Sequence, residues 1–522
     1  MYSALLWKEQ FVELSEEIEQ TLMSDMEQEN TYRKKQDVSG QYMFRLEEKK
    51  TVELTYMSEK IQVSDFFEQS GDDIREDGMP EQGSHLWNVG EETENINIKE
   101  TGMGGIRKSN AKYHRGKSVL VKQGYGEKML YHLRKCNQEL LLLKRECSQY
   151  RIIENLEAFM QNLLRFQTVL DDYLSEAEEV ELSVRELLLN FYFEVNHFLS
   201  IYDLLDDNYV MYTQICQDGS FFVKLLCVNP GENLKNCMMR ARSTILFSAT
   251  FLPIQYYKKL LGGDKEDYEV YAKSVFHPAK RALLIASDVT SKYTRRSQSE
   301  YYNIARYIEE IVRNRHGNYM VFCPSYAFLR IIYDLYAEHF GHEDRECILQ
   351  NESMSEADRE EFLEKFQANC KDSGNGIGQT KAAKESGLKN MGEDKVLIGF
   401  CVLGGIFSEG IDLKNDSLIG VIIIGTGLPQ VCDEREILKA YFDANGEDGF
   451  DYSYRYPGMN KVLQAAGRVI RTVEDVGIIA LLDERFLQYS YRRLFPLEWQ
   501  QFDAVTVNNV AKRVERFWDE WL

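Results

Sequence analysis

The carboxyl-terminal half of the sequence alternates short apolar runs with amphipathic helical stretches, and this alternation constrains the fold more than any other feature. Helical periodicity covers 298–314, 326–339 and 355–368. Apolar runs separated by helices are typical of a doubly wound, mostly parallel sheet. The sequence therefore predicts an α/β fold with strands at Ala282–Ala286, Tyr319–Cys323, Glu346–Leu349, Val396–Cys401, Ile419–Ile424 and Ile478–Leu482, preceded by a short strand at Thr244–Phe247.

The amino-terminal half has a different character. Residues 1–19 begin with an amphipathic helical pattern, whereas residues 20–127 are polar and poorly periodic. Between residues 61 and 100 there are 11 acidic and 2 basic side chains, so we predict that the segment 20–127 is largely disordered or loosely packed. From residue 128 to residue 208, apolar side chains recur at three- and four-residue spacing, which indicates a long helical hairpin or bundle.

Composition narrows the class of protein. The chain has 62 basic and 84 acidic residues, a net charge of −22, so any nucleic-acid site has to be a local groove. Its ten cysteines form no C-x-x-C pairs, and we interpret them as reduced core thiols of a cytoplasmic protein rather than metal ligands. The longest uncharged apolar stretch is short of the roughly 20 residues that a bilayer crossing needs, so no membrane association is expected.

The strongest local signal is the octapeptide QAAGRVIR at 464–471. On a continuous helix, Gln464, Arg468 and Arg471 are spaced i, i+4 and i+7 and share one face, and the small residues between them let another domain approach closely. Two guanidinium groups and an amide suit a phosphate chain that gains charge during transfer. Taken alone, however, two arginines on a helix more often form a solvated face.

Other polar segments follow predicted strands. GGIFSEGIDL at 404–413 comes directly after the strand at Val396–Cys401, and loops at the carboxyl ends of parallel strands are where such sheets bind ligands. Asp412 in this loop suits a ribose hydroxyl or an arginine. The segments 248–250 and 322–326 place hydroxyls where they can meet phosphate oxygens. Taken alone, the loop is compatible with a structural turn and each hydroxyl with a helix N-cap.

The order and spacing of these segments resemble the later motifs of superfamily 2 helicases of the DinG/XPD-like group. ILFSATFLP (245–253) looks like motif III, MVFCPSY (320–326) like motif IV, GGIFSEGIDL (404–413) like motif V and QAAGRVIR (464–471) like motif VI. The resemblance implies a RecA-like helicase domain 2 over 281–522 and an arch-like helical domain over 128–230. It also implies remnants of helicase domain 1 at 1–19 and, with motif III, at 231–280.

The resemblance further implies an activity and its residues. The family comprises ATP-dependent DNA helicases, and the group's direction of movement is 5′ to 3′ on single-stranded or forked DNA, in replication or repair, with ATP and Mg²⁺. By this resemblance Arg471 is the arginine finger, and Arg468 and Gln464 contact ATP phosphates or couple hydrolysis. The other implied residues are Gly410, Asp412 and Gly467 for ATP, and Ser325, Tyr326, Ser408, Glu409, Ser248 and Thr250 for DNA.

Two motifs that such helicases need are not found in the sequence: a phosphate loop ending in Gly-Lys-Ser/Thr, and a strand ending in Asp-Glu-Ala-His. The single Gly-Lys-Ser, at 116–118, has Ala111 where the loop needs glycine. The Asp-Glu at 483–484 follows the arginine segment rather than preceding it, and we interpret Asp483 and Arg485 as a structural pair.

We therefore expect the carboxyl-terminal portion of a longer helicase, with no metal ligands and no iron–sulfur cluster in this chain, that does not hydrolyse ATP without its amino-terminal half. The alternative is a non-catalytic half-helicase module that binds DNA or a partner protein. RNA instead of DNA as the substrate also stays open, because these motifs contact the nucleic-acid backbone more than the bases.

Overall fold

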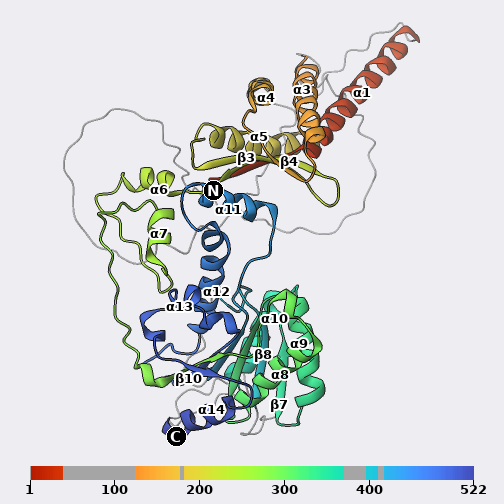
Figure 1. Cartoon of the computed structure of the whole chain (residues 1–522). Helices are drawn as coiled ribbons and strands as arrows, with labels where there is room; N and C mark the ends of the chain where they lie inside the picture. The colour runs from red at the N-terminus through yellow and green to blue at the C-terminus, as the bar shows by residue number, and fades with distance from the viewer. Residues whose placement is uncertain (1, 39–123, 177–181, 369–395, 409–416, 522) are drawn as a thin grey trace, which may run out of the picture.

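The computed structural model describes residues 2–38, 124–176, 182–368, 396–408 and 417–521. Figure 1 shows two units, a helical unit built from the described residues up to 228 and an α/β domain that begins at residue 281. Residues 229–280 link the two units along the chain. The part of the predicted disordered segment between 39 and 123 lies outside the described residues.

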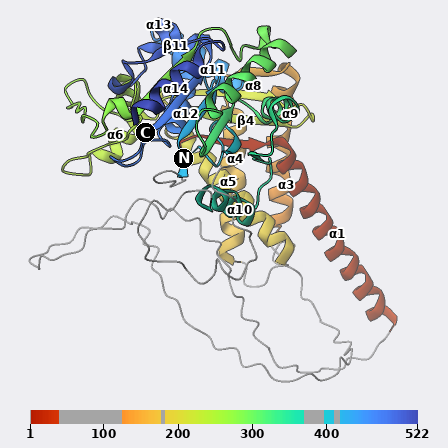
Figure 2. The same ribbon diagram turned by 90° about the horizontal axis from the view of Figure 1, so that it is seen from below.

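The helical unit combines four helices with a small antiparallel sheet. The apolar stripe that predicted helices in this region, represented by Leu133, Cys136 and Leu140, is fully buried in the core of the unit. Helices α1 and α3 pack together, and α1 projects outward beyond the unit (Figure 2). The helices confirm the predicted bundle. They are α1 (Lys8–Val38), α3 (Tyr125–Glu146), α4 (Glu157–Glu176) and α5 (Leu182–Tyr202).

The sheet of the helical unit was not predicted. Its strand order is β1-β4-β3-β2, and β1 pairs antiparallel with β4. Leu6 of β1 and Phe11 of α1 lie in the same core as the helices, so the first described residues belong physically to the helical unit. The assignment of residues 1–19 to helicase domain 1 stays a prediction. The strands are β1 (Ala4–Trp7), β2 (Tyr150–Ile152), β3 (Tyr209–Ile215) and β4 (Phe221–Cys227).

Two sequence-based expectations differ from the structure. Helix α1 continues to Val38, so residues 20–38 are helical rather than part of an irregular insertion. The predicted strand Thr244–Phe247 is wrong for this chain: the linking segment contains α6 (Gly231–Met238) and α7 (Ile254–Leu260) and no strand. Ile245 and Phe247 are 84% and 87% exposed. A single β-rich run without a neighbouring strand has no partner for its backbone hydrogen bonds.

The α/β domain is built on a seven-stranded sheet with the order β11-β5-β10-β9-β6-β8-β7. Every neighbouring pair is parallel, which confirms the predicted fold class and its six strands. Only β11 was not predicted. The strands are β5 (Arg281–Ala286), β6 (Asn318–Cys323), β7 (Arg345–Leu349), β8 (Val396–Val402), β9 (Gly420–Ile424), β10 (Gly477–Leu482) and β11 (Asp503–Val505).

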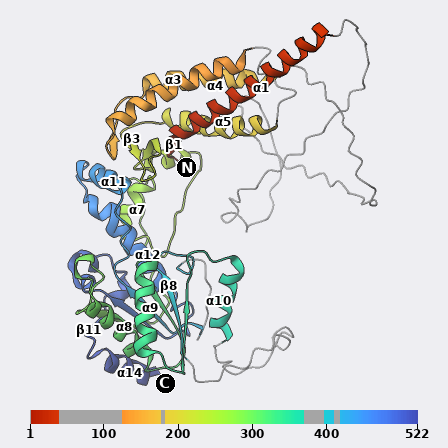
Figure 3. The same ribbon diagram turned by 90° about the vertical axis from the view of Figure 1, so that its right-hand side faces the viewer.

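Alternate side chains of the strands enter two apolar layers. In β5, Leu284 lies in the layer formed with α8, α9 and α14, whereas Leu283 lies in the layer formed with α10 and α12. Figure 3 shows α9 and α10 on opposite sides of β8. The helices are α8 (Gln298–Val312), α9 (Tyr326–Phe340), α10 (Glu356–Ala368), α11 (Asp433–Ala444), α12 (Tyr456–Ala466), α13 (Tyr489–Arg492) and α14 (Val510–Trp521).

The amino end of α11 joins the α/β domain to the helical unit. The Asp433 carboxylate accepts hydrogen bonds from the side-chain amides of Gln149 (2.8 Å) and Gln214 (2.9 Å). The neighbouring Glu434 carboxylate pairs with Lys224 and accepts a hydrogen bond from the Tyr212 hydroxyl. Beside these contacts lies an apolar cluster shared by the antiparallel sheet, α11 and α7. We call this set of contacts the α11 joint.

Asp483, at the end of β10, is a fully buried carboxylate with a complete set of donors. It receives two hydrogen bonds of 2.8 Å from the Arg485 guanidinium and further ones from Thr290 and Ser291. The predicted structural pair of Asp483 and Arg485 is confirmed. Burial alone would raise the pKa of Asp483, but Arg485 and the Ser291 backbone N–H bring this pKa below its ordinary value.

Replacing Asp483 by asparagine removes the negative charge of the pair and leaves the largely buried Arg485 guanidinium without a counter-charge. The substitution is therefore expected to lower the free energy of unfolding by roughly 3–5 kcal/mol. Urea unfolding of the wild type and of Asp483→Asn measures this loss. Because the pKa of Asp483 is lower in the folded than in the unfolded protein, its charge stabilises the fold at pH values above the unfolded pKa of about 3.9. This stabilisation is lost as the pH falls through the folded pKa. The difference between the two proteins should therefore shrink in acid.

The matched control is Asp503→Asn, because Asp503 is exposed and lies 3.7 Å from Arg513. This change is expected to cost about 0–1 kcal/mol. Equal destabilisation by the two substitutions would contradict the structural role assigned to Asp483.

Candidate nucleotide- and nucleic-acid-binding edge

The candidate site lies where the parallel strands end. Because all seven strands run in the same direction, the loops after β6, β8 and β9 leave from one edge of the sheet. Helix α12 packs against this edge at very short range. A Cβ atom on Gly458 would lie 2.8 Å from the Thr426 carbonyl oxygen, and one on Gly427 would lie 2.5 Å from the Gly458 carbonyl oxygen. Glycine at both positions is therefore what allows backbone to meet backbone here.

The loop after β8 opens with a tight turn. Gly404 has φ of +79°, a conformation that favours glycine. The Ser408 hydroxyl accepts a hydrogen bond of 2.8 Å from the Gly404 backbone N–H and donates one to the Val402 carbonyl. Ser408 is fully buried, so its hydroxyl closes the turn. Its predicted DNA contact stays a prediction, and the predicted residues Glu409, Gly410 and Asp412 lie outside the described residues.

Arg468 connects the octapeptide to this loop. Its guanidinium donates two hydrogen bonds to the Ser408 carbonyl oxygen, from Nε at 3.1 Å and from Nη2 at 2.8 Å. The guanidinium is therefore directed at the beginning of the loop that carries Asp412. Within the described residues, the octapeptide therefore lies beside the start of this loop, as expected.

The expected shared helical face is wrong. Helix α12 ends at Ala466, with Gly467 as its C-cap, and Arg468 and Arg471 follow in the connection to β10. The last turn tightens because the Arg468 backbone N–H bonds to the Ala465 carbonyl three residues back. The buried carboxylate of Asp475 then fixes the backbone that follows. It accepts hydrogen bonds from the backbone N–H of Arg471 at 2.7 Å and of Thr472 at 2.6 Å.

The small residues of the octapeptide also have a different environment from the expected one. Ala465 and Ala466 are buried against the domain's own sheet, so their size serves packing within the domain rather than the approach of another domain. Gly467 is exposed. Gln464, Arg468 and Arg471 are all partly exposed, so none of the three side chains is fully buried at this edge.

Gln350 is a site residue that the sequence analysis missed. It is 2% exposed, and its amide oxygen accepts a hydrogen bond of 2.9 Å from the Val402 backbone N–H at the end of β8. Its amide nitrogen donates to the Tyr326 hydroxyl at 2.9 Å. Gln350 thus holds the first residue of α9 beside the loop after β8. The available signal was a polar side chain directly after the apolar run of β7.

The remaining predicted residues are placed as follows. Ser325 is the N-cap of α9 and accepts a hydrogen bond from the Phe328 backbone N–H. Ser248 and Thr250 lie in a small turn of the linking segment, in which the Thr250 backbone N–H donates a hydrogen bond of 3.1 Å to the Ser248 hydroxyl. They therefore lie on a different element from the loops after β6 and β8, and the structure does not bring the two groups into contact.

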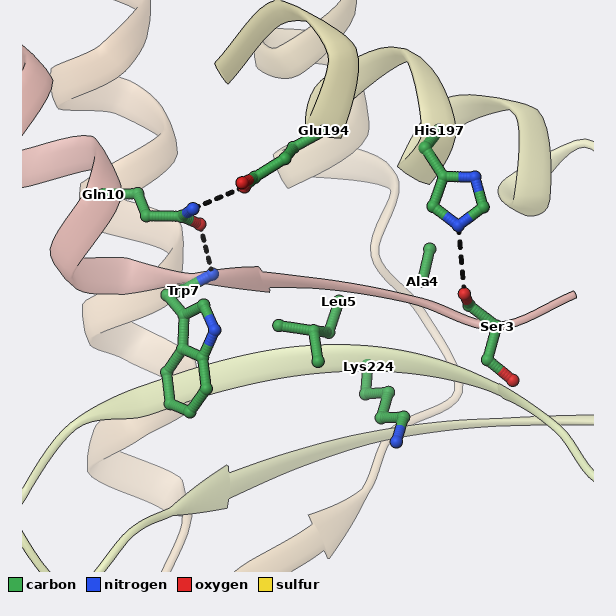
Figure 4. A pocket seen from close by; sticks show the side chains of 8 residues that line it. All are labelled: Ser3, Ala4, Leu5, Trp7, Gln10, Glu194, His197 and Lys224. Carbon is green, nitrogen blue, oxygen red and sulfur yellow. Dashed lines mark hydrogen bonds between the residues drawn. The ribbon is translucent and has the colours of Figure 1, made fainter. Parts of the chain in front are cut away.

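A pocket of about 430 Å³ lies on the helical unit, away from this edge. Figure 4 shows β1 and the start of α1 facing α5 across it: Gln10 donates a hydrogen bond to Glu194, and the His197 ring nitrogen Nε2 lies 3.1 Å from the Ser3 carbonyl oxygen. These polar groups hold β1 against α5, and none of the predicted site residues is among them. The pocket is not part of the candidate site.

Metal ligands and membrane spans were also sought. In the part of the chain that the structure describes, no three His, Cys, Asp or Glu side chains gather into a cluster able to hold a metal ion. Within the same residues, no helix combines the length and apolar character that a bilayer crossing requires. The nine described cysteines are free thiols.

Comparisons with known proteins find similarity to helicases. Residues 308–502 match the family described as the helicase C-terminal domain. The chain is 25% identical over 307 residues to the ATP-dependent DNA helicase chl-1 of Caenorhabditis elegans, covering 54% of this chain and 34% of that protein. It is 28% identical over 261 residues to the ATP-dependent DNA helicase XPD of Sulfolobus acidocaldarius, covering 48% of this chain and 40% of that protein.

A solved structure titled XPD_APO is similar with a TM-score of 0.43 and 20% identity, over 72% of this chain and 69% of that one. The match to the helicase C-terminal domain falls within the α/β domain, and the chain spans about a third to two fifths of the length of the two helicases named above. These similarities to ATP-dependent DNA helicases agree with the resemblance of the motifs to the DinG/XPD-like group of superfamily 2 helicases.

Replacing Gln350 by leucine is expected to lower the free energy of unfolding by about 1–3 kcal/mol, because it removes the acceptor of the Val402 N–H and the donor to Tyr326. The urea midpoint measures the effect. Gln500→Leu changes an exposed glutamine and serves as the control, with an expected effect within about 0.5 kcal/mol. If both variants unfold at the wild-type urea concentration, Gln350 does not hold the two loops together.

Proposed function

We propose that this chain provides the second motor domain and a helical accessory unit of an ATP-dependent DNA helicase. The full enzyme would couple ATP hydrolysis to 5′ to 3′ movement along single-stranded or forked DNA, in replication or repair. The observation that carries the proposal is the contact between the Arg468 guanidinium and the Ser408 carbonyl, which places the arginine segment at the loop after β8. We propose a cytoplasmic location, in keeping with the free thiols.

The arginines suit the phosphate end of a bound nucleotide. A guanidinium presented to the transferred phosphoryl group stabilises the charge that develops there, and we assign this role to Arg471, with Arg468 and Gln464 beside it. ATP and Mg²⁺ supply the reactive phosphate and its neutralising charge when bound. The described residues offer no metal-ion cluster and the sequence has no phosphate loop, so we propose that a first motor domain, outside this chain, holds both.

We further propose that the helical unit corresponds to the arch domain of the group. Its position in the sequence, ahead of the segment that looks like motif III, supports this assignment. The exposed apolar side chains of the linking segment support a partner surface for the first motor domain. Ile245, Phe247, Val270 and Val275 are each at least 77% exposed, which is unusual for four apolar residues within about 30 positions.

The alternative function is a non-catalytic module that binds DNA or a partner protein through these same surfaces, and the exposed linking segment favours it equally. The two candidate functions predict different sequences upstream of the gene. An upstream reading frame that encodes the phosphate loop and an Asp-Glu-Ala-His strand supports the enzyme, whereas a promoter and a ribosome-binding site directly before Met1 support the module.

The purified chain, mixed with ATP, Mg²⁺ and single-stranded DNA, is expected to release no phosphate above the buffer rate, because the arginines have no bound γ-phosphate to act on. Arg471→Ala should leave this baseline unchanged. A phosphate-release assay checks both proteins. Turnover by the wild type that Arg471→Ala abolishes would show that the chain carries a complete ATPase site.

The chain is expected to bind a single-stranded oligonucleotide, with affinity that falls as salt rises and depends little on base sequence, because the contacts are to the backbone. Fluorescence anisotropy with labelled oligothymidine and a mixed-sequence strand measures this, and an RNA strand of the same sequence tests the choice of nucleic acid. Failure to bind any of the three at low salt would contradict the proposed DNA-binding role.

A further inference from the structure

The helix that leads into the octapeptide contains a π-helical turn. Residues Asp451–Arg455 form this π-helix, which continues without a break into α12. The Tyr456 backbone N–H bonds to the Asp451 carbonyl five residues back, whereas an α-helix uses the carbonyl four residues back. Such turns are rare and are frequent at functional sites, so we looked for the cause of this one and for its contacts.

Pro457 accounts for the π-helix. A proline inside a helix has no backbone N–H, and in a regular α-helix its ring collides with the carbonyl four residues earlier. That carbonyl belongs to Ser453, and the wider π-turn makes room for the ring. The usual α-helical donor to the Ser453 carbonyl is therefore missing. Ser453 is 1% exposed, so its carbonyl depends on donors from the protein.

A donor to this carbonyl comes from the first turn of α11. The Arg435 guanidinium donates a hydrogen bond of 2.8 Å to the Ser453 carbonyl. The next residue, Glu436, accepts a hydrogen bond of 2.6 Å from the hydroxyl of Tyr454, which also lies in the π-helix. Two neighbouring side chains of α11 thus hold the π-helix in place.

The same turn of α11 binds the helical unit through the two residues that come before. Asp433 accepts hydrogen bonds from the side-chain amides of Gln149 and Gln214, and Glu434 pairs with Lys224 of β4. Four consecutive side chains of one helical turn therefore join the antiparallel sheet to the π-helix. Figures 1 and 3 show α11 between the helical unit and α12.

At its other end, α12 leads to the arginine that contacts the loop after β8. Arg468 follows the C-cap of α12 and donates two hydrogen bonds to the Ser408 carbonyl. Between its two ends, the backbone of α12 meets the loop after β9 at Gly458 and Gly427, with no side chain between them to absorb a movement. A change at the start of this helix can therefore reach Arg468.

We propose that α11 and the π-helix couple the seating of the helical unit to the position of Arg468. While the α11 joint is intact, Arg435 keeps the Ser453 carbonyl bonded and the π-helix closed. When the helical unit leaves the joint, the π-helix opens more often and Arg468 loses its place at Ser408. The coupling is a property of the fold, and its use to control the proposed ATPase arginines rests on the proposed function.

Backbone hydrogen exchange of the chain without ligands tests the coupling, because exchange reports local opening segment by segment. The double variant Gln149→Ala/Gln214→Ala weakens the joint from the helical unit and leaves α11 and α12 unaltered. Peptides covering 451–466 should then exchange about tenfold faster, and those covering 403–408 should follow. Peptides covering β5 and α8 should exchange as in the wild type.

The matched control is Gln138→Ala/Gln161→Ala, which replaces two exposed glutamines of the same unit, on α3 and α4. Exchange throughout the α/β domain should stay at the wild-type rate. If the joint variant leaves exchange at 451–466 unchanged, the coupling is wrong. If its effect extends equally to β5 and α8, the substitutions destabilise the whole domain, and this outcome also overturns the proposal.

Two further substitutions test the route through the Ser453 carbonyl. Arg435→Met removes the donor from α11 and should speed exchange at 451–466 as much as the joint variant does. Combining the two should have no further effect, because they break one route. Pro457→Ala restores a backbone N–H that can bond to the Ser453 carbonyl within the helix.

In the Pro457→Ala background, neither Arg435→Met nor the joint variant should alter exchange at 451–466. If both still speed exchange there, the route does not pass through the π-helix and the proposal is overturned.

The exchange measurement contains neither nucleotide nor nucleic acid, so its failure differs from failure of the proposed function. Unchanged exchange in the joint variant removes the coupling and leaves the proposed helicase function in place. If the unaltered chain does not bind single-stranded DNA, the proposed function falls, whereas faster exchange confined to 451–466 and 403–408 still establishes the coupling between the two units.

Discussion

The parallel direction of the seven strands is the constraint on which the rest of the structure depends. Because each strand pairs with a neighbour that runs the same way, the loops after β6, β8 and β9 leave from one edge. Tyr326 and Val402, which are far apart in the sequence, are thereby linked through the Gln350 amide. An antiparallel arrangement of the same strands would distribute these loops over two edges.

At that edge, backbone carbonyls and amides organise the charged side chains. Arg468 is positioned by the Ser408 carbonyl, and Arg471 is positioned by the hydrogen bond from its own backbone N–H to Asp475. These backbone contacts fix the place of the two guanidinium groups beside the loop after β8.

The sequence predicted the sheet well because buried parallel strands read as uninterrupted apolar runs such as Ile419–Ile424. It did not reveal the antiparallel sheet of the helical unit, although β3 and β4 are joined through Asp218-Gly219, a pair typical of hairpins, with Gly219 at φ of +85°. Strand formation at 244–247 was predicted from local β-propensity, which has no effect without a neighbouring strand. The octapeptide was placed on one helix because periodicity alone does not show that Gly467 ends α12.

The candidate site was predictable in its segments but not in its geometry. The resemblance to known motifs identified the octapeptide and the loop after β8. Gln350 instead acts through contacts with distant parts of the chain, Tyr326 and Val402, and no local pattern marks these contacts. The hydroxyls of Ser325 and Ser408 show the same limit. Their sequence context fits a phosphate contact, yet in the structure one caps α9 and the other closes a turn.

The α11 joint has a consequence for how the protein responds to its solvent. Its ionic component is the pair between Lys224 and Glu434, whose side chains are 18% and 37% exposed, and mobile ions screen charges that are accessible to water. Added salt therefore acts on the mechanical coupling between the two units as well as on any bound polyanion. Screening does not weaken the apolar cluster beside the joint, so added salt is expected to weaken the ionic part of the joint without separating the two units.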